Sequence, residues 1–105
     1  MEELDNHARN SLSQGFDLTE AQLISKEKIL AALSERISQL MAGNPDQLFS
    51  MLYRLDISEK KIKMVLQQQE NIALHLAQLI YERQLQKAAS RKHFGRQEPD
   101  DELSW

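Results

Sequence analysis

Apolar side chains recur at helical spacing between residues 19 and 43. Leucine, isoleucine and methionine return there every three or four positions, which places them along one face of an α-helix. Thr19 stands three residues before Gln22, as in a capping box at a helix start, and Gly43 suits a helix end. The pattern predicts a long amphipathic helix over residues 19–43.

Three further segments show the same periodicity. Residues 44–56 open with Asn-Pro, a typical helix start, and residues 58–69 open with a serine cap. The last segment covers residues 71–90, and its basic side chains gather in the final turns, where they suit the helix dipole. No alternating strand pattern occurs. We therefore expect an all-α fold, a small bundle of about four helices in one domain over residues 18–94.

The two ends of the chain differ from this pattern. Residues 1–17 and 95–105 are polar and charged, and segments of such composition bury too little apolar surface to fold alone. We predict a polar N-terminal tail over residues 1–17 and an acidic C-terminal tail over residues 95–105, both loosely ordered. Trp105 is the apolar exception, and we expect it to fray rather than to dock in a groove.

The last predicted helix is apolar on two sides. One stripe consists of Ile72, Leu76, Leu79 and Ile80, and the other of Leu74, Tyr81 and Leu85. A helix with so much apolar circumference is either central to its bundle or shared with a partner. We expect a homodimer whose interface includes residues of the second stripe.

Composition removes several classes of chemistry. The chain of 105 residues contains no cysteine, which excludes disulfides, thiolate zinc sites and thiol nucleophiles. No apolar run approaches the roughly 18 residues of a membrane span, and the first ten residues are acidic and polar, unlike a signal peptide. We expect a soluble, cytoplasmic protein that does not contact a membrane.

The net charge of −3 is unevenly distributed. Residues 1–18 and 96–105 each carry four acids and one base, whereas residues 71–95 carry one acid and four bases. Broad nucleic-acid binding depends on a sustained positive surface, so this distribution disfavours it. One alternative is kept: residues 52–62 have the outline of a helix-turn-helix, in which the second helix would present Lys60, Lys61 and Lys63 to nucleic acid.

The tripeptide Arg54-Leu-Asp56 interrupts an apolar helical pattern and allows two interpretations. In the first, Asp56 helps to cap the helix that begins near Ser58, and Arg54 lies at the border of the apolar face. In the second, Tyr53, Arg54 and Asp56 join Arg83 in a polar site for a small anion, because the arginine fork suits carboxylate or phosphate. We favour the first interpretation and keep the second as an alternative.

The sequence contains no recognised catalytic motif. There is no phosphate-binding loop, no nucleophile elbow and no zinc-protease helix signature. His75 lies in the apolar last helix, where a catalytic base would need an orienting partner and a substrate cavity. We therefore expect no enzymatic activity, no catalytic residue, no cofactor and no bound metal.

The stretches LFSMLYRLDISEKKI and LAQLIYERQLQK resemble a family of small, uncharacterised all-helical proteins of bacteria, over about residues 45–95. The resemblance implies a helical domain and no particular activity. Together with the two apolar sides of the last helix, it leads us to predict a non-enzymatic protein–protein interaction or scaffold module. The sequence does not identify the protein partner.

Overall fold

The computed structural model describes residues 4–94, with side chains as far as Arg91. The elements are α1 (Asn6–Phe16), the short 3₁₀-helix η1 (Glu20–Leu23), α2 (Lys26–Gly43), α3 (Pro45–Arg54), α4 (Glu59–Gln68) and α5 (Ile72–Phe94). Strands are absent from this part of the chain, so the predicted all-α fold is confirmed. The described residues hold five α-helices rather than about four.

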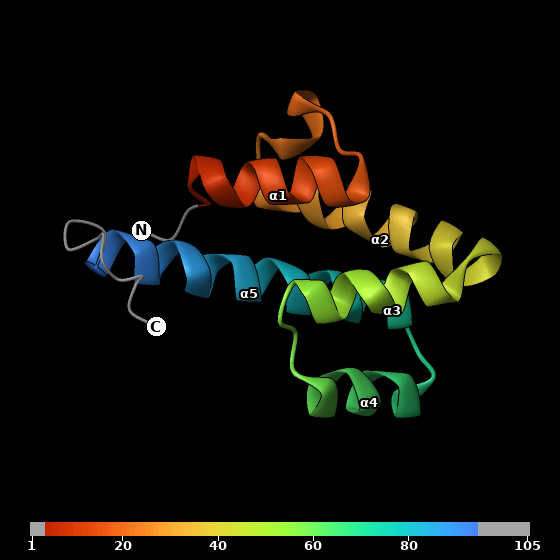
Figure 1. The fold of residues 1–105 in the computed structure, drawn as a ribbon. Coiled ribbons are helices and arrows are strands. Elements are labelled where there is room, and N and C mark those ends of the chain that lie inside the picture. Colours follow the sequence, from red (N-terminus) through yellow and green to blue (C-terminus); the bar gives the residue numbers. More distant parts are fainter. Residues whose placement is uncertain (1–3, 95–105) are drawn as a thin grey trace.

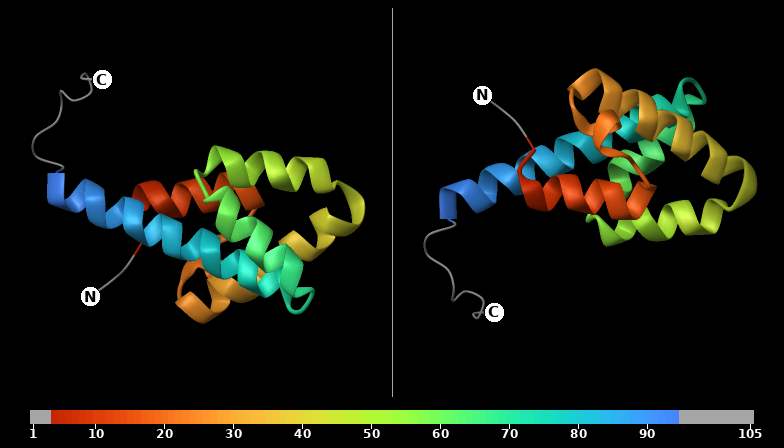
Figure 2. Two further views of the ribbon diagram at one scale, coloured as in Figure 1. Left: turned by 90° about the horizontal axis from the view of Figure 1, so that it is seen from below. Right: turned by 90° about the horizontal axis from the view of Figure 1, so that it is seen from above.

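Helix α5 is the central element of the bundle. It runs between α1 and α2 on one side and α4 on the other (Figures 1 and 2), and its most extensive contact is with α2. Leu76, Ala77 and Ile80 are completely buried, and Tyr81 and Ala88 are nearly so. The two apolar sides predicted for this helix are therefore largely covered by helices of the same chain.

The predicted polar N-terminal tail over residues 1–17 is wrong, because most of this segment forms helix α1. Leu4, Ala8, Leu12 and Phe16 recur every fourth position and form a buried stripe, and α1 packs on α5 through this side. Asp5 caps the helix, because its side chain accepts a hydrogen bond from the Ala8 backbone N–H at 2.9 Å. The polar composition of the segment concealed this stripe. The predicted acidic tail over residues 95–105, with Trp105, lies outside the described residues.

The predicted helix over residues 19–43 is divided in two. The capping box at Thr19 is present, with the Thr19 N–H donating to Gln22 Oε1 at 2.8 Å, but it caps only η1. Ser25 then caps α2, where its Oγ accepts the Lys28 N–H at 3.2 Å. Ile24 lies in the break and is 65% exposed. A second capping residue six positions after the first thus allows the chain to change direction.

The turn at Arg54-Leu-Asp56 is a helix end. The Asp56 N–H donates to the Tyr53 carbonyl at 3.0 Å, and the Ile57 N–H donates to the Leu52 carbonyl at 3.1 Å. These are the two bonds of a Schellman motif, with Asp56 in the left-handed region at φ 65°. Asp56 therefore ends α3 rather than capping α4, and that cap is Ser58, whose Oγ accepts the Lys61 N–H. The predicted break between the helical segments 44–56 and 58–69 is confirmed.

Candidate functional site

The three predicted interface residues on α5 do not form one free surface. Tyr81 is only 7% exposed, and Leu85 is partly buried against the core. Lys26, at the start of α2, places its Nζ 5.7 Å from the centroid of the Tyr81 ring. Leu74 alone stays well exposed, at 38%. The start of α2 covers the Tyr81 side of α5, so this part of the predicted interface is corrected to an internal contact.

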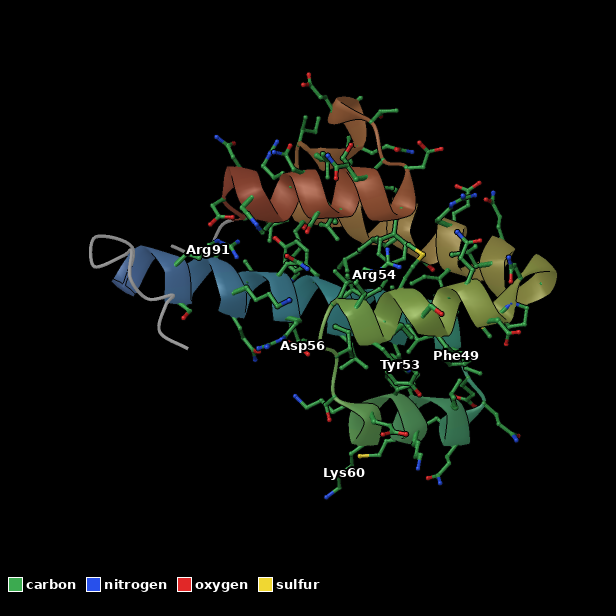
Figure 3. The ribbon with its side chains drawn as sticks, in the orientation of Figure 1. Phe49, Tyr53, Arg54, Asp56, Lys60 and Arg91 are labelled. Carbon is green, nitrogen blue, oxygen red and sulfur yellow. The ribbon has the colours of Figure 1, made fainter. Side chains whose placement is uncertain are left out.

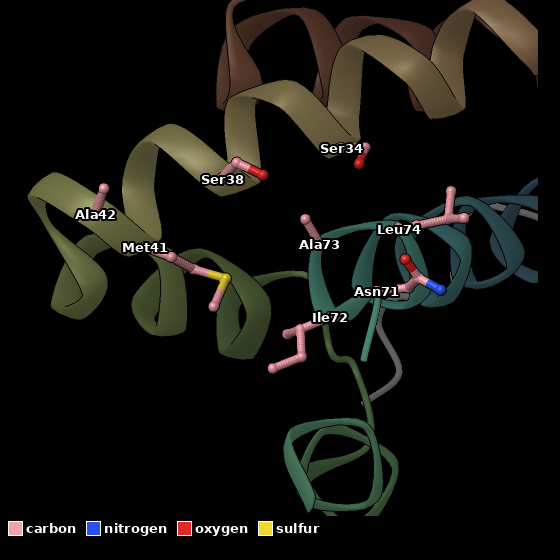
Figure 4. A pocket seen from close by; sticks show the side chains of 8 residues that line it. All are labelled: Ser34, Ser38, Met41, Ala42, Asn71, Ile72, Ala73 and Leu74. Carbon is pink, nitrogen blue, oxygen red and sulfur yellow. The ribbon is translucent and has the colours of Figure 1, made fainter. Parts of the chain in front are cut away.

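Leu74 lies beside a groove between the second half of α2 and the first turn of α5 (Figure 4). The groove has a volume of about 560 Å³ and is open to solvent. Its α2 side is formed mainly by small side chains, which leave room between the two helices. The lining residues are Ser34, Ser38, Met41, Ala42, Asn71, Ile72, Ala73 and Leu74.

The chemistry of this groove favours contact rather than catalysis. None of its lining side chains is ionisable at neutral pH, so the groove supplies no general acid or base. Met41, Ile72 and Leu74 offer apolar surface, and the two serines and Asn71 offer a few hydrogen-bonding groups. A surface of this kind suits an apolar side chain or helix from a partner.

The predicted polar site forms only in part. Arg83 Nη2 lies 3.8 Å from Asp56 Oδ2, and Arg83 Nη1 donates to Gln86 Oε1 at 3.2 Å. Tyr53 and Arg54 do not line the small depression beside this pair, and both are exposed (Figure 3). The Arg54 side chain makes no hydrogen bond or ion pair within the described part of the chain. The four residues therefore do not converge on one anion.

The depression beside Asp56 and Arg83 has a volume of about 150 Å³ and lies between the start of α4 and the middle of α5. Two acids and two bases line it, so its own charge is balanced. The lining residues are Asp56, Ile57, Ser58, Lys61, Leu79, Glu82, Arg83 and Gln86. We call this surface the α4/α5 depression.

Lys60, Lys61 and Lys63 are all exposed on α4. However, α4 packs on α5 whereas α3 packs on α2, and the two helices share little contact with each other (Figure 1). In a helix-turn-helix the first helix supports the second against the groove of the nucleic acid. The backbones of α3 and α4 therefore lie less closely against each other than against α2 and α5, and the helix-turn-helix alternative stays a prediction.

Two features were missed in the sequence. Arg91 binds Asp5 through two hydrogen bonds, from Nε to Oδ2 at 2.8 Å and from Nη2 to Oδ1 at 2.7 Å. These bonds lower the pKa of the Asp5 carboxyl from its ordinary 3.8 to about 2. Gln84 is 1% exposed, and its Nε2 has no hydrogen-bond partner. The position of Gln84 between Tyr81 and Ala88 on one helical side was a signal of burial.

His75 is half-buried, and its Nδ1 also has no hydrogen-bond partner. Within residues 4–94, no group of three or more histidine, aspartate or glutamate side chains could hold a metal ion. Nor does any helix in this range combine the length and apolar character needed to cross a membrane. The groove at Leu74 and the exposed lysines of α4 remain as candidate surfaces.

Comparisons with protein-family models, with curated proteins and with solved structures found no match. The resemblance to a bacterial helical family therefore stays a prediction. What can be inferred about function comes from the surfaces of the molecule itself.

Proposed function

We propose that the protein is a non-catalytic helical interaction module that forms a homodimer through the groove between α2 and α5. The observation that carries the proposal is the position of Leu74. This side chain is 38% exposed and lies directly beside a hollow of about 560 Å³ that small residues leave open. Covering both would remove apolar surface from water, which is the main driving force of association.

A second copy of the chain suits this surface because the surface carries both halves of a contact. Leu74 projects at its edge, and Ser34, Ser38 and Ala42 form its hollow side (Figure 4). In a two-fold symmetric interface the same patch is used twice, so each copy can place its leucine in the hollow of the other. Small side chains also allow two helices to approach closely.

This dimer differs from the one expected from the sequence in its residues. Tyr81 and Leu85 serve the fold of the single chain, and the contact moves toward the start of α5. A dimeric module of this kind binds two copies of a further protein partner, one on each chain. The expected cytoplasmic location is part of the same proposal.

Light scattering coupled to size-exclusion chromatography tests the dimer. We expect the full chain to show the mass of two copies at high micromolar concentration and Leu74→Glu to show the mass of one. The matched control is Ile24→Glu, which places the same charge on a side chain that is 65% exposed and does not line the groove. A monomeric wild-type protein at that concentration would refute the proposal. So would equal masses for the two variants.

A second variant tests the hollow rather than the projecting side chain. Ser38 is exposed and lines the groove, so Ser38→Leu fills the space without removing a buried contact. We expect this variant to keep its helical circular dichroism and to dissociate at a higher concentration than the wild type. A dimer of undiminished affinity would place the interface elsewhere.

A further inference from the structure

The exposed surface of α4 combines positive charge with apolar surface. Three lysines, Lys60, Lys61 and Lys63, accompany one acid, Glu59, in this helix, and all four are exposed. None of the three lysines forms an ion pair with another residue of the range 4–94. Met64 follows in the next turn and is 53% exposed. The surface therefore suits an acidic ligand that also carries a large apolar group.

The α4/α5 depression extends this surface toward α5. Lys61 lines it from α4, and Leu79 and Gln86 line it from α5. Asp56 and Arg83 pair with each other at 3.8 Å, which leaves Lys61 and Glu82 as the unpaired charges of the lining. Positive charge thus prevails on the α4 side, and Leu79 adds apolar surface to the lining.

A segment of matching chemistry belongs to the same chain. Residues 98–105, which lie outside the described residues, contain four acids followed by a leucine and a tryptophan: Glu98, Asp100, Asp101, Glu102, Leu103 and Trp105. We infer that this segment binds intramolecularly to α4 and the α4/α5 depression. In this contact the acids lie over the α4 lysines, and Trp105 packs against the exposed apolar surface of Met64 instead of fraying as expected from the sequence alone.

The length of the segment permits this contact. Gln86, in the depression, is eight residues before Phe94, so the two are separated by about 12 Å along α5. The eleven residues from 95 to 105 span up to roughly 36 Å when extended. This is enough to return along α5 and to cross α4. Gly95 directly follows α5, and glycine at this position readily permits a chain reversal.

The order of groups along the segment also matches the surface. The acids are four to eight residues beyond Phe94, and Trp105 is eleven residues beyond it. On the surface, Lys61 lies at the depression, and Met64 lies about one helical turn farther along α4. The inference is independent of the proposed dimer, since the groove at Leu74 takes no part in it.

Trp105 is the only tryptophan of the chain, so intrinsic tryptophan fluorescence of the full-length protein reports on this segment alone. We expect an emission maximum at shorter wavelength, and weaker quenching by acrylamide, than in a peptide of residues 96–105. Both effects should be lost in Lys61→Glu and in 1 M salt, where the screening length falls to about 3 Å. The matched control is Lys28→Glu, a charge reversal at an exposed lysine of α2, which should leave the emission unchanged.

Lys60→Glu provides a second test on the same helix, and circular dichroism checks that each variant is folded. If Trp105 in the full-length protein has the same emission maximum and quenching as in the free peptide, the inference is wrong. Protected emission that neither Lys61→Glu nor Lys60→Glu alters would place Trp105 elsewhere and would also overturn it. Protection that disappears on dilution would show binding between copies, which contradicts the intramolecular contact.

Discussion

Arg91 donates hydrogen bonds to both carboxylate oxygens of Asp5, at 2.8 and 2.7 Å, although 86 positions separate the two residues. The same carboxylate accepts the Ala8 N–H and so begins α1. One side chain thus starts the first helix and attaches it near the end of the last (Figure 3, where Arg91 is labelled). Because α1 packs on α5, this attachment contributes to the fold of the whole bundle.

The two roles of Asp5 can be separated by substitution. Asp5→Ala removes both the cap and the ion pair, whereas Asp5→Asn keeps an oxygen that can cap α1. We expect Asp5→Ala to lower the free energy of unfolding by roughly 1–2 kcal/mol, because a cap contributes about 1 kcal/mol and a partly exposed pair less. Asp5→Asn should lower the free energy of unfolding by less than about 1 kcal/mol, because only the ion pair is lost. Urea unfolding followed by circular dichroism measures both.

A control for these variants is Asn6→Ala, which alters an exposed side chain of the first turn without removing a cap or a charge. We expect it to change the free energy of unfolding by less than about 0.5 kcal/mol. Equal losses for Asp5→Ala and Asp5→Asn would contradict a capping role for Asp5.

The Asp5 pKa predicts a specific dependence of stability on pH. The folded pKa of about 2 lies below the ordinary 3.8, so folding favours the charged carboxylate. Its stabilising contribution is complete above 3.8 and is lost as the pH falls through about 2. The difference in unfolding free energy between the wild type and Asp5→Asn should therefore become smaller as the pH falls from 3.8 to about 2. Other carboxylates titrate in both proteins alike, so the difference isolates Asp5.

Arg91→Gln provides the reciprocal measurement. It removes the hydrogen bonds that lower the pKa of Asp5, so this variant should differ little from the double variant with Asp5→Asn at any pH in that range. If the difference in free energy of unfolding between the wild type and Asp5→Asn stays constant down to pH 2, Arg91 does not hold the pKa of Asp5 low.

Local signals in the sequence located α3 and α4 well. Asn44 caps α3 by accepting the Gln47 N–H, and Ser58 caps α4, both as predicted. Such caps depend on contacts three residues apart, which a sequence displays directly. Helix α1 was missed because its mean composition is polar, although its apolar residues recur every fourth position. For a segment of this length the spacing of apolar residues was the better signal.

The candidate surfaces were harder to predict from the sequence than the helices. Asp56 and Arg83 do meet, as the polar-site alternative required, but Tyr53 and Arg54 do not join them. Tyr81 and Leu74 are seven residues apart and share a side of α5, yet one is buried and the other exposed. That difference depends on where α2 crosses α5 and on the small size of Ser34 and Ser38. Packing between distant segments decides such details, and periodicity alone does not contain them.

Gln69 ends α4 in the left-handed region, with φ 60°, and its side chain is exposed. This conformation costs an L-residue roughly 1–2 kcal/mol, whereas glycine adopts it without a steric penalty. Part of the gain is offset because glycine has more conformational entropy to lose on folding. We expect Gln69→Gly to raise the free energy of unfolding by roughly 0.5–1 kcal/mol in urea titrations.

The matched control for that variant is Gln67→Gly, two residues earlier, where the residue is exposed and helical. There glycine should lower the free energy of unfolding by up to about 1 kcal/mol. A destabilised Gln69→Gly would mean that the glutamine side chain contributes a contact larger than the backbone cost.

Gln84 is buried on α5 although its Nε2 has no hydrogen-bond partner. A buried polar group left without a bond costs roughly 1–3 kcal/mol. Methionine has a similar length and an unbranched shape and carries no amide, so Gln84→Met should relieve this cost with little change in packing. We expect the free energy of unfolding to rise by about 1 kcal/mol. Gln78→Met, at an exposed position of the same helix, should leave it nearly unchanged. If Gln84→Met instead destabilises the protein, the amide takes part in a polar contact that holds α5 within the bundle.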